Sequence, residues 1–227
     1  MKNFLILLLS LMACWNAQGV VAEASLAMAV VGEVDPALAE RVRAFAEENL
    51  ALPVRLLEPC EAAEAASLNA IGEAAAQGLG EADVCLVVLA APVAPLPNHG
   101  IMMPEIKTAV INVPVLKPED GDAERFGRRV EREAMMSIGL LLGLETCPNP
   151  QCAMWLYSNN EELDAKGRNY CPPCLDRVQK LAAGKGIKAI AGSPFAPLAE
   201  ESIPGKPAPE EQGPEGAGEP EPIEETP

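Results

Sequence analysis

The sequence is poor in basic residues and contains a single histidine. It has 17 Lys and Arg against 33 Asp and Glu, which gives a formal net charge of −16. Nucleic acids and anionic membrane surfaces are bound by clustered Lys and Arg, so the composition argues against both as partners. A hydrolytic zinc site normally has three protein ligands and an open position for water. His99, the one imidazole, is therefore insufficient for such a site.

A long hydrophobic run is also missing, because the apolar stretch at positions 4–12 is too short to cross a bilayer as a helix. Its length is that of a secretory signal core, so residues 1–24 are predicted to be a signal peptide. Export to the periplasm, cell envelope or medium is expected. The letters LMAC, ending at Cys14, resemble a lipobox, which would leave Cys14 lipid-anchored as the only membrane attachment. Ordinary cleavage after Ala22 or Ala24 remains the alternative.

The C-terminal segment 191–227 has few large apolar residues and is rich in Pro, Gly and Glu. Nine Glu and one Lys lie between Glu200 and Pro227, so about half of the net charge is found there. Such a segment cannot bury enough apolar surface to order itself, and we predict a disordered acidic tail.

The segment 25–190 between these ends has the pattern of one α/β domain. The apolar run Leu26–Gly32 is typical of a buried strand, and Asp35 with Pro36 marks a helix start. An amphipathic helix over 37–50 and a strand over 54–57 complete a β-α-β unit, for which parallel pairing is the default. Further elements are expected as a helix over 61–77, strands over 83–90 and 108–116, a long helix ending at Gly143, and a short helix over 175–183.

Two details of these later elements bear on function. Pro114 within the run 108–116 indicates an edge strand or its end. The long helix alternates charged and apolar residues as far as Glu133 and is apolar all round from there to Gly143. Its C-terminal half is therefore predicted to be buried under other elements.

Four cysteines follow that helix, with the spacing C-x4-C and C-x2-C. They are Cys147, Cys152, Cys171 and Cys174, and this spacing suits one tetrahedral Zn²⁺ held by thiolates in a structural site. Two disulfides are the alternative, because an exported protein meets an oxidising environment. Cys85 lies in an apolar run and is expected to be a small buried hydrophobe.

The same stretch resembles the archaemetzincins. In that metzincin family the signature HExxHxxGxxH supplies three zinc-binding histidines and a general base, and C-x4-C-x-M with a later C-x2-C follows. Cys147, Cys152, Met154, Cys171 and Cys174 take the family's positions, as do Gly139 and Gly143. The resemblance implies a zincin-like fold of mixed sheet and packed helices with a C-terminal four-cysteine zinc segment.

The signature positions themselves have other residues. Met136, Ser137, Leu140 and Thr146 stand where the resemblance implies His, Glu, His and His. A thioether favours Cu(I), leucine has no donor atom, and the two hydroxyls replace neither a zinc ligand nor a carboxylate base. We therefore predict a catalytically inactive relative that is not an enzyme, with Met154 packing in the core. The alternative is a residual zinc metallopeptidase with a non-standard site.

Two non-enzymatic roles remain open. A cleft that persists could bind an extended peptide or protein ligand along the edge strand near 108–116, because strand addition needs only backbone groups. Alternatively, the domain is a structural envelope module whose acidic tail makes the interactions. The sequence gives no indication of the oligomeric state.

Overall fold

The computed structural model describes residues 23–193 apart from 63 and 66. These residues fall within one compact unit. The predicted signal peptide, with Cys14, and the acidic tail lie almost entirely outside the described part. Within that part, no helix combines the length and hydropathy that a membrane crossing requires.

A five-stranded mixed sheet forms the centre of the domain, in the order β2-β1-β3-β5-β4. Strand β3 (Asp83–Ala91) pairs in parallel with β1 (Ser25–Gly32) and β5 (Thr108–Asn112), and β1 pairs in parallel with β2 (Val54–Leu56). Strand β4 (Gly100–Met103) runs antiparallel to β5 and forms one edge. The predicted mixed α/β fold is confirmed.

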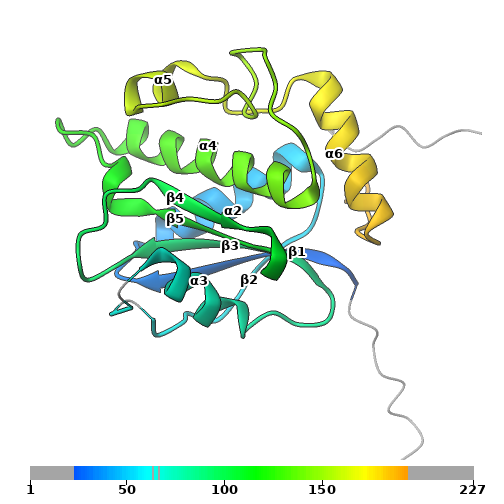
Figure 1. Cartoon of the computed structure of the whole chain (residues 1–227). Coiled ribbons are helices and arrows are strands. Elements are labelled where there is room, and N and C mark those ends of the chain that lie inside the picture. The colour runs from blue at the N-terminus through cyan, green and yellow to red at the C-terminus, as the bar shows by residue number, and fades with distance from the viewer. Residues whose placement is uncertain (1–22, 63, 66, 194–227) are drawn as a thin grey trace, which may run out of the picture. The chain divides into compact units, whose positions relative to one another are not determined.

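Helices cover both faces of the sheet (Figure 1). Helices α2 (Pro36–Leu50) and α4 (Ala123–Leu142) pack on one face, and α3 (Leu68–Ala76) packs on the other. The strand residues alternate between the two layers. Leu26 and Met28 of β1 join the core under α2 and α4, whereas Ala27 and Ala29 join the core under α3.

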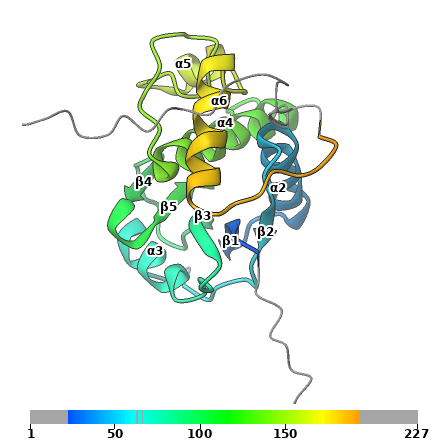
Figure 2. The same cartoon turned by 90° about the vertical axis from the view of Figure 1, so that its right-hand side faces the viewer.

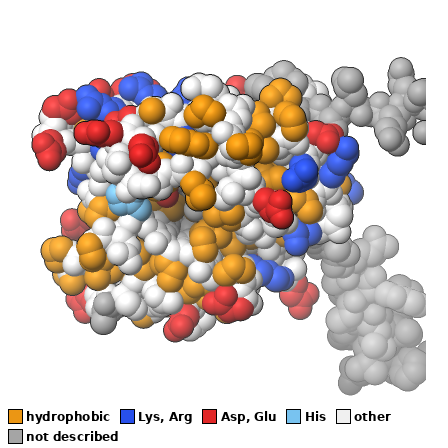
Figure 3. All heavy atoms as spheres, turned by 45° about the horizontal axis from the view of Figure 1, so that its top comes forward, with side chains coloured by type: hydrophobic (Ala, Val, Ile, Leu, Met, Phe, Trp, Pro, Cys, Tyr) orange, Lys and Arg blue, Asp and Glu red, His pale blue; other side chains and the backbone are white. Residues whose placement is uncertain are grey.

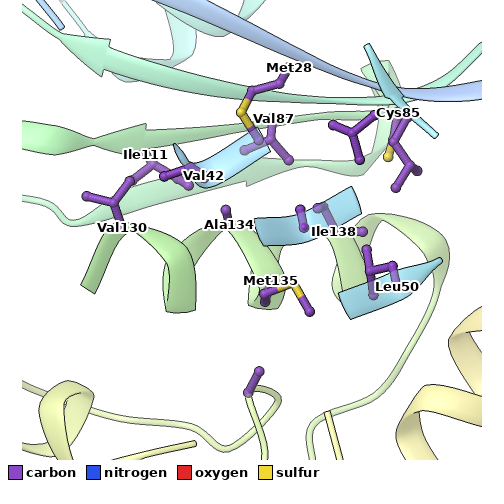
Figure 4. Close-up of a cluster of buried hydrophobic side chains, with 14 of the residues drawn as sticks. Met28, Val42, Leu50, Cys85, Val87, Ile111, Val130, Ala134, Met135 and Ile138 are labelled. Atoms are coloured by element: carbon purple, nitrogen blue, oxygen red, sulfur yellow. The ribbon is translucent and has the colours of Figure 1, made fainter. Parts of the chain in front are cut away.

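The larger core lies between the sheet and the two helices α2 and α4. Figure 4 shows Val130, Ala134 and Ile138 of α4 on the side that faces Met28, Val87 and Ile111 of the sheet. Each of these six side chains is at most 1% exposed. The i, i+4, i+8 spacing of the helical residues places them on one stripe, which explains why α4 lies flat across the strands.

Helix α4 ends where the sequence predicts. The Asp122 side chain accepts a hydrogen bond from the backbone N–H of Arg125, at 2.9 Å, and so caps the first turn. Gly143 ends the helix with φ of 101°, and the Leu144 N–H donates to the Gly139 carbonyl at 2.8 Å. The predicted charged surface of the helix is wrong in one respect, because Arg129, Glu131, Arg132 and Glu133 are all buried.

The two buried arginines have partners in the segment after the first cysteine pair. The guanidinium of Arg129 forms two hydrogen bonds to the Asp164 carboxylate, at 2.9 and 2.7 Å, and Arg132 donates to backbone carbonyls of the same segment. Asp164 lies in α5 (Asn160–Ala165), a helix that the sequence pattern does not predict. The buried arginines thus fix the segment that follows the first cysteine pair against α4.

Several predicted boundaries shift in the structure. The expected helix over 61–77 is the shorter α3, capped by Ser67. The run 108–116 is a strand only to Asn112 and continues as the 3-10 turn Val113–Leu116. It is also not at the edge, because β4, which the sequence does not predict, lies outside it and is followed by the 3-10 turn Pro104–Ile106. The last helix, α6 (Pro172–Gly184), begins three residues before its predicted start and lies beside the C-terminal end of α4 (Figures 1 and 2).

Candidate metal centre and adjacent cleft

The four predicted cysteine ligands come together in one cluster. Cys147 and Cys152 lie in the loop after α4, Cys171 caps α6, and Cys174 lies in its first turn. All four Sγ atoms are within 4.8 Å of one another. Thiolates at about 2.3 Å from a tetrahedral Zn²⁺ lie about 3.8 Å apart, and the Sγ atoms of Cys147 and Cys171 are separated by 3.8 Å.

The surroundings of the cluster also suit a metal. The backbone N–H groups of Met154 and Cys171 point at the Cys152 sulfur, at 3.5 and 3.4 Å. Such donors stabilise a thiolate and orient it as a ligand. The six cysteines in the described part of the chain are unpaired, so the disulfide alternative is not the arrangement seen. The cluster therefore fits one Zn²⁺ that ties the loop after α4 to the start of α6.

Close packing joins this loop to α4. A Cβ on Gly139 would lie 2.5 Å from the Met154 Sδ and 2.8 Å from the Tyr170 hydroxyl. Met154 is completely buried, as predicted, and Tyr170 donates a hydrogen bond to the Met135 carbonyl at 2.5 Å. Glycine at position 139 therefore permits the close approach of the loop to the helix.

A cavity of about 540 Å³ lies between β4 and the neighbouring face of α4. Figure 3 shows this side of the molecule, with histidine in pale blue. Met136, Ser137 and Leu140, three of the four signature positions, line the cavity together. Thr146 is exposed beyond the end of the helix and is not among the lining residues. The lining residues are Pro97, Asn98, His99, Gly100, Ile101, Met102, Val110, Ile111, Glu133, Met136, Ser137, Leu140, Tyr157 and Ser158.

The cavity residues do not fit a catalytic zinc ion. The Met136 Sδ accepts a hydrogen bond from the Lys166 Nζ at 3.4 Å, and the Leu140 side chain has no donor atom. Among the described residues, the cysteine cluster is the one group of three or more His, Cys, Asp or Glu whose ligand atoms could share a metal. The structure thus supports the structural metal centre and gives no ligand set for a second one.

His99 contributes to the cleft in a way that the sequence does not indicate. Its ring stacks on Tyr157 with centroids 5.8 Å apart, and its Nδ1 lies 3.2 Å from the Tyr157 hydroxyl. Burial, and then the charge of Arg129, lowers the pKa of His99 below its ordinary value. The imidazole is therefore neutral near pH 7. The two residues are 58 positions apart, so no local pattern relates them.

Glu133 and Lys166 complete a polar group behind this ring pair. Burial raises the pKa of Glu133, against a hydrogen bond from Tyr157 and the charge of Lys166. Burial likewise lowers the pKa of Lys166 to about 8, against the charge of Glu133. The Lys166 ammonium also lies 4.9 Å from the centre of the Tyr157 ring. Sequence reasoning missed both residues, because each lies in a stretch that looks polar and solvated.

Comparisons with known proteins give a consistent result. Residues 99–180 match peptidase family M54. Archaemetzincin from Pyrococcus abyssi is 34% identical over 85 residues, which are 36% of this chain and 45% of the relative. Archaemetzincin from Pyrococcus horikoshii is 33% identical over 88 residues, 37% of this chain and 47% of the relative. The chain thus spans about half the length of the curated relatives it matches.

The similarity of this fold to solved structures covers most of the domain. The alignment with the crystal structure of archaemetzincin from Methanopyrus kandleri covers 70% of this chain and 96% of the archaemetzincin chain, with a TM-score of 0.55 and 21% identity. The alignment with the crystal structure of a zinc-dependent peptidase from Methanocorpusculum labreanum covers 68% of this chain and all of the peptidase chain, with a TM-score of 0.55 and 19% identity. At these identities the likeness establishes the fold.

The prediction that the protein is not an enzyme is wrong. The matching family is a peptidase family, and the relatives are archaemetzincins, so the comparisons point to an enzyme. The residues at positions 136, 137, 140 and 146 do not by themselves show that activity has been lost. The match at 99–180, the alignments and the shared fold lead to one conclusion: residues 99–180 are similar to peptidase family M54, and the domain has the archaemetzincin fold.

Proposed function

We propose that this protein binds extended peptides in the cleft between β4 and α4, within a domain held together by one zinc ion on the four cysteines. The observation that carries the proposal is the position of β4. This strand forms one edge of the sheet, and the 540 Å³ cavity lies directly beside it. A peptide that adds to the edge would place alternate side chains in the cavity.

The pairing of β4 with β5 indicates which backbone groups are available. The Asn112 N–H donates to the His99 carbonyl at 2.7 Å, so that pair is hydrogen-bonded. Opposed residues of antiparallel strands alternate between bonded and non-bonded pairs. Ile101 and Met103 therefore bond to β5, and the backbone groups of Gly100 and Met102 face the open edge.

Cleavage of the bound peptide is a second candidate function. It is favoured by the peptidase relatives and by the two titratable side chains, His99 and Glu133, that line the cleft. The cavity residues do not fit the family's metal. Export, inferred from the apolar N-terminus, is part of the proposal and places the peptide outside the cytoplasm.

A peptide library tests both functions. The mature full-length protein would be incubated with fluorescent decapeptides, and binding followed by anisotropy. The best binder is then resynthesised with a single backbone N-methyl group at each position in turn. Strand addition predicts that affinity falls at every second position and is retained between them, because alternate amides face β4. Uniform losses, or no binding at all, would overturn the proposal. Mass spectrometry of the same mixtures detects cleavage.

A further inference from the structure

The cavity beside β4 is lined by one acidic side chain and by no lysine or arginine. Among the residues that line the cavity, Glu133 is the single acidic residue. His99 is neutral there, and the remaining lining side chains are apolar or uncharged polar. Lys166 is 1% exposed and does not line the cavity. A ligand in the cavity therefore meets one carboxyl group in a wall that is otherwise apolar or uncharged polar.

Glu133 has unused hydrogen-bonding capacity. Glu133 is buried, with 8% of its surface exposed, and its Oε1 has no hydrogen-bond partner among the described residues. Tyr157 provides one hydrogen bond to the carboxylate. A buried carboxylate oxygen without a donor raises the free energy of the free protein, and a donor brought by a ligand would offset it.

The neighbouring cation does not supply that donor. The Lys166 Nζ donates a hydrogen bond to the Met136 Sδ. The ammonium also lies over the Tyr157 ring. Burial raises the pKa of Glu133, and the positive charge of Lys166 opposes this rise only in part. The carboxylate is thus set up as an acceptor with capacity left for a group that enters from the cavity.

The shape of the cavity indicates how such a group arrives. Met136 and Leu140 follow Glu133 along the same face of α4, and Ile101 and Met102 lie on the β4 side. An aliphatic stem can pack against these apolar side chains while its polar end reaches the carboxylate. A peptide on the edge of β4 can direct one side chain inward in this way.

We propose that the cleft selects a cationic group, the ammonium of a lysine side chain or of a peptide N-terminus, which forms a charge-assisted hydrogen bond with Glu133. The proposal rests on the proposed peptide-binding function and adds a preference to it. An acidic group at the same position would be repelled by the carboxylate, and an apolar group would leave it without a donor.

Four fluorescent peptides distinguish the two sources of the ammonium. The first is an acetylated alanine-rich peptide with one central lysine, the second has norleucine in its place, the third has glutamate, and the fourth has norleucine with a free N-terminus. Anisotropy titrations with the full-length protein should give about 10- to 100-fold tighter binding for the lysine peptide or the free N-terminus than for the acetylated norleucine peptide. The glutamate peptide should bind more weakly than the norleucine peptide.

Two variants of equal net charge locate the effect. Glu133→Gln keeps the shape of the side chain and should reduce the cation preference to within about twofold, whereas Glu119→Gln, at an exposed position, should retain it in full. Equal binding of charged and neutral peptides by the wild type would overturn the cation preference and leave peptide binding intact. A preference that survives Glu133→Gln would overturn the assignment to this residue. No binding of any peptide would instead overturn the proposed function itself.

Discussion

The Nζ of Lys166 lies 3.4 Å from the Sδ of Met136, so a buried ammonium contacts a thioether on the cavity face of α4. Lys166 is 1% exposed. The contact links the cleft to the metal-binding segment. Met136 lines the cleft, and Lys166 follows α5 in the segment between the two cysteine pairs. The metal centre thus supports the residues behind the cleft.

Removal of the metal should destabilise the fold. Cys147→Ser together with Cys174→Ser takes one ligand from each cysteine pair, and the free energy of unfolding should fall by about 3 kcal/mol or more. A strong chelator should lower the melting temperature of the wild type and leave that of the variant unchanged. Calorimetric scans with and without chelator measure both. Cys60→Ser, at a half-buried position outside the cluster, is the matched control. Equal melting of all three proteins would refute the zinc assignment.

Close packing at Gly139 gives a second prediction. Gly139→Ala forces a Cβ to within 2.5 Å of the Met154 Sδ, and we expect a loss of about 1–3 kcal/mol in the free energy of unfolding. Gly184→Ala, at the end of α6, meets no atom within 4 Å and should be neutral or slightly stabilising. Urea titrations of the two variants give the comparison. If Gly139→Ala were as stable as Gly184→Ala, the described approach of the loop to α4 would be incorrect.

Glu133 gives a prediction of pH dependence. Burial raises its pKa in the folded protein, although Tyr157 and Lys166, which face it, oppose the effect. A carboxyl group with a raised folded pKa supports stability fully below its unfolded pKa, and this contribution is lost as the pH rises through the folded value. Glu133→Gln removes that loss. The variant should therefore gain stability relative to the wild type as the pH increases through this window.

The size of that gain follows from the shift. Each unit of difference between the folded and unfolded pKa corresponds to about 1.4 kcal/mol. Urea unfolding of both proteins at a series of pH values between 4 and 8 provides the measurement, with Glu119→Gln as the exposed control. A difference in unfolding free energy that stays constant with pH would show that Glu133 titrates as an ordinary carboxyl group.

The same residue predicts how peptide affinity depends on pH. Only the ionised carboxylate attracts a cationic group, so binding of the lysine peptide should tighten as the pH rises through the raised pKa of Glu133. The acetylated norleucine peptide should show little change over the same range. Anisotropy titrations at matched ionic strength test this, since salt alone alters exposed charge interactions. Parallel pH profiles for the two peptides would contradict the assignment.

Local sequence patterns predict the parts of the fold that depend on neighbours along the chain. The start of α2 at Asp35 and Pro36, the end of α4 at Gly143 and the grouping of the four cysteines all follow from local residue patterns. The sequence also indicates that Met136, Ser137 and Leu140 share one helix face, which lines the cleft.

What the sequence does not reveal depends on contacts between distant segments. Strand β4 is only Gly100–Met103 and is defined by its pairing with β5, so a short apolar run gave no signal for it. Glu133 looks like part of a solvated helix face, and Lys166 lies in a polar stretch. Both are nevertheless buried by the packing of the chain after the first cysteine pair. Their burial is a tertiary effect that periodicity cannot show.

The most direct test of the account is the metal content of the purified mature protein. Elemental analysis by mass spectrometry, scaled to protein concentration, should find one zinc per chain, and Cys147→Ser with Cys174→Ser should lose it. Glu133→Gln and a His99→Ala variant should retain it, because neither residue belongs to the cysteine cluster. Two zinc ions per chain, with one lost on His99→Ala, would contradict the account and assign a metal to the cleft.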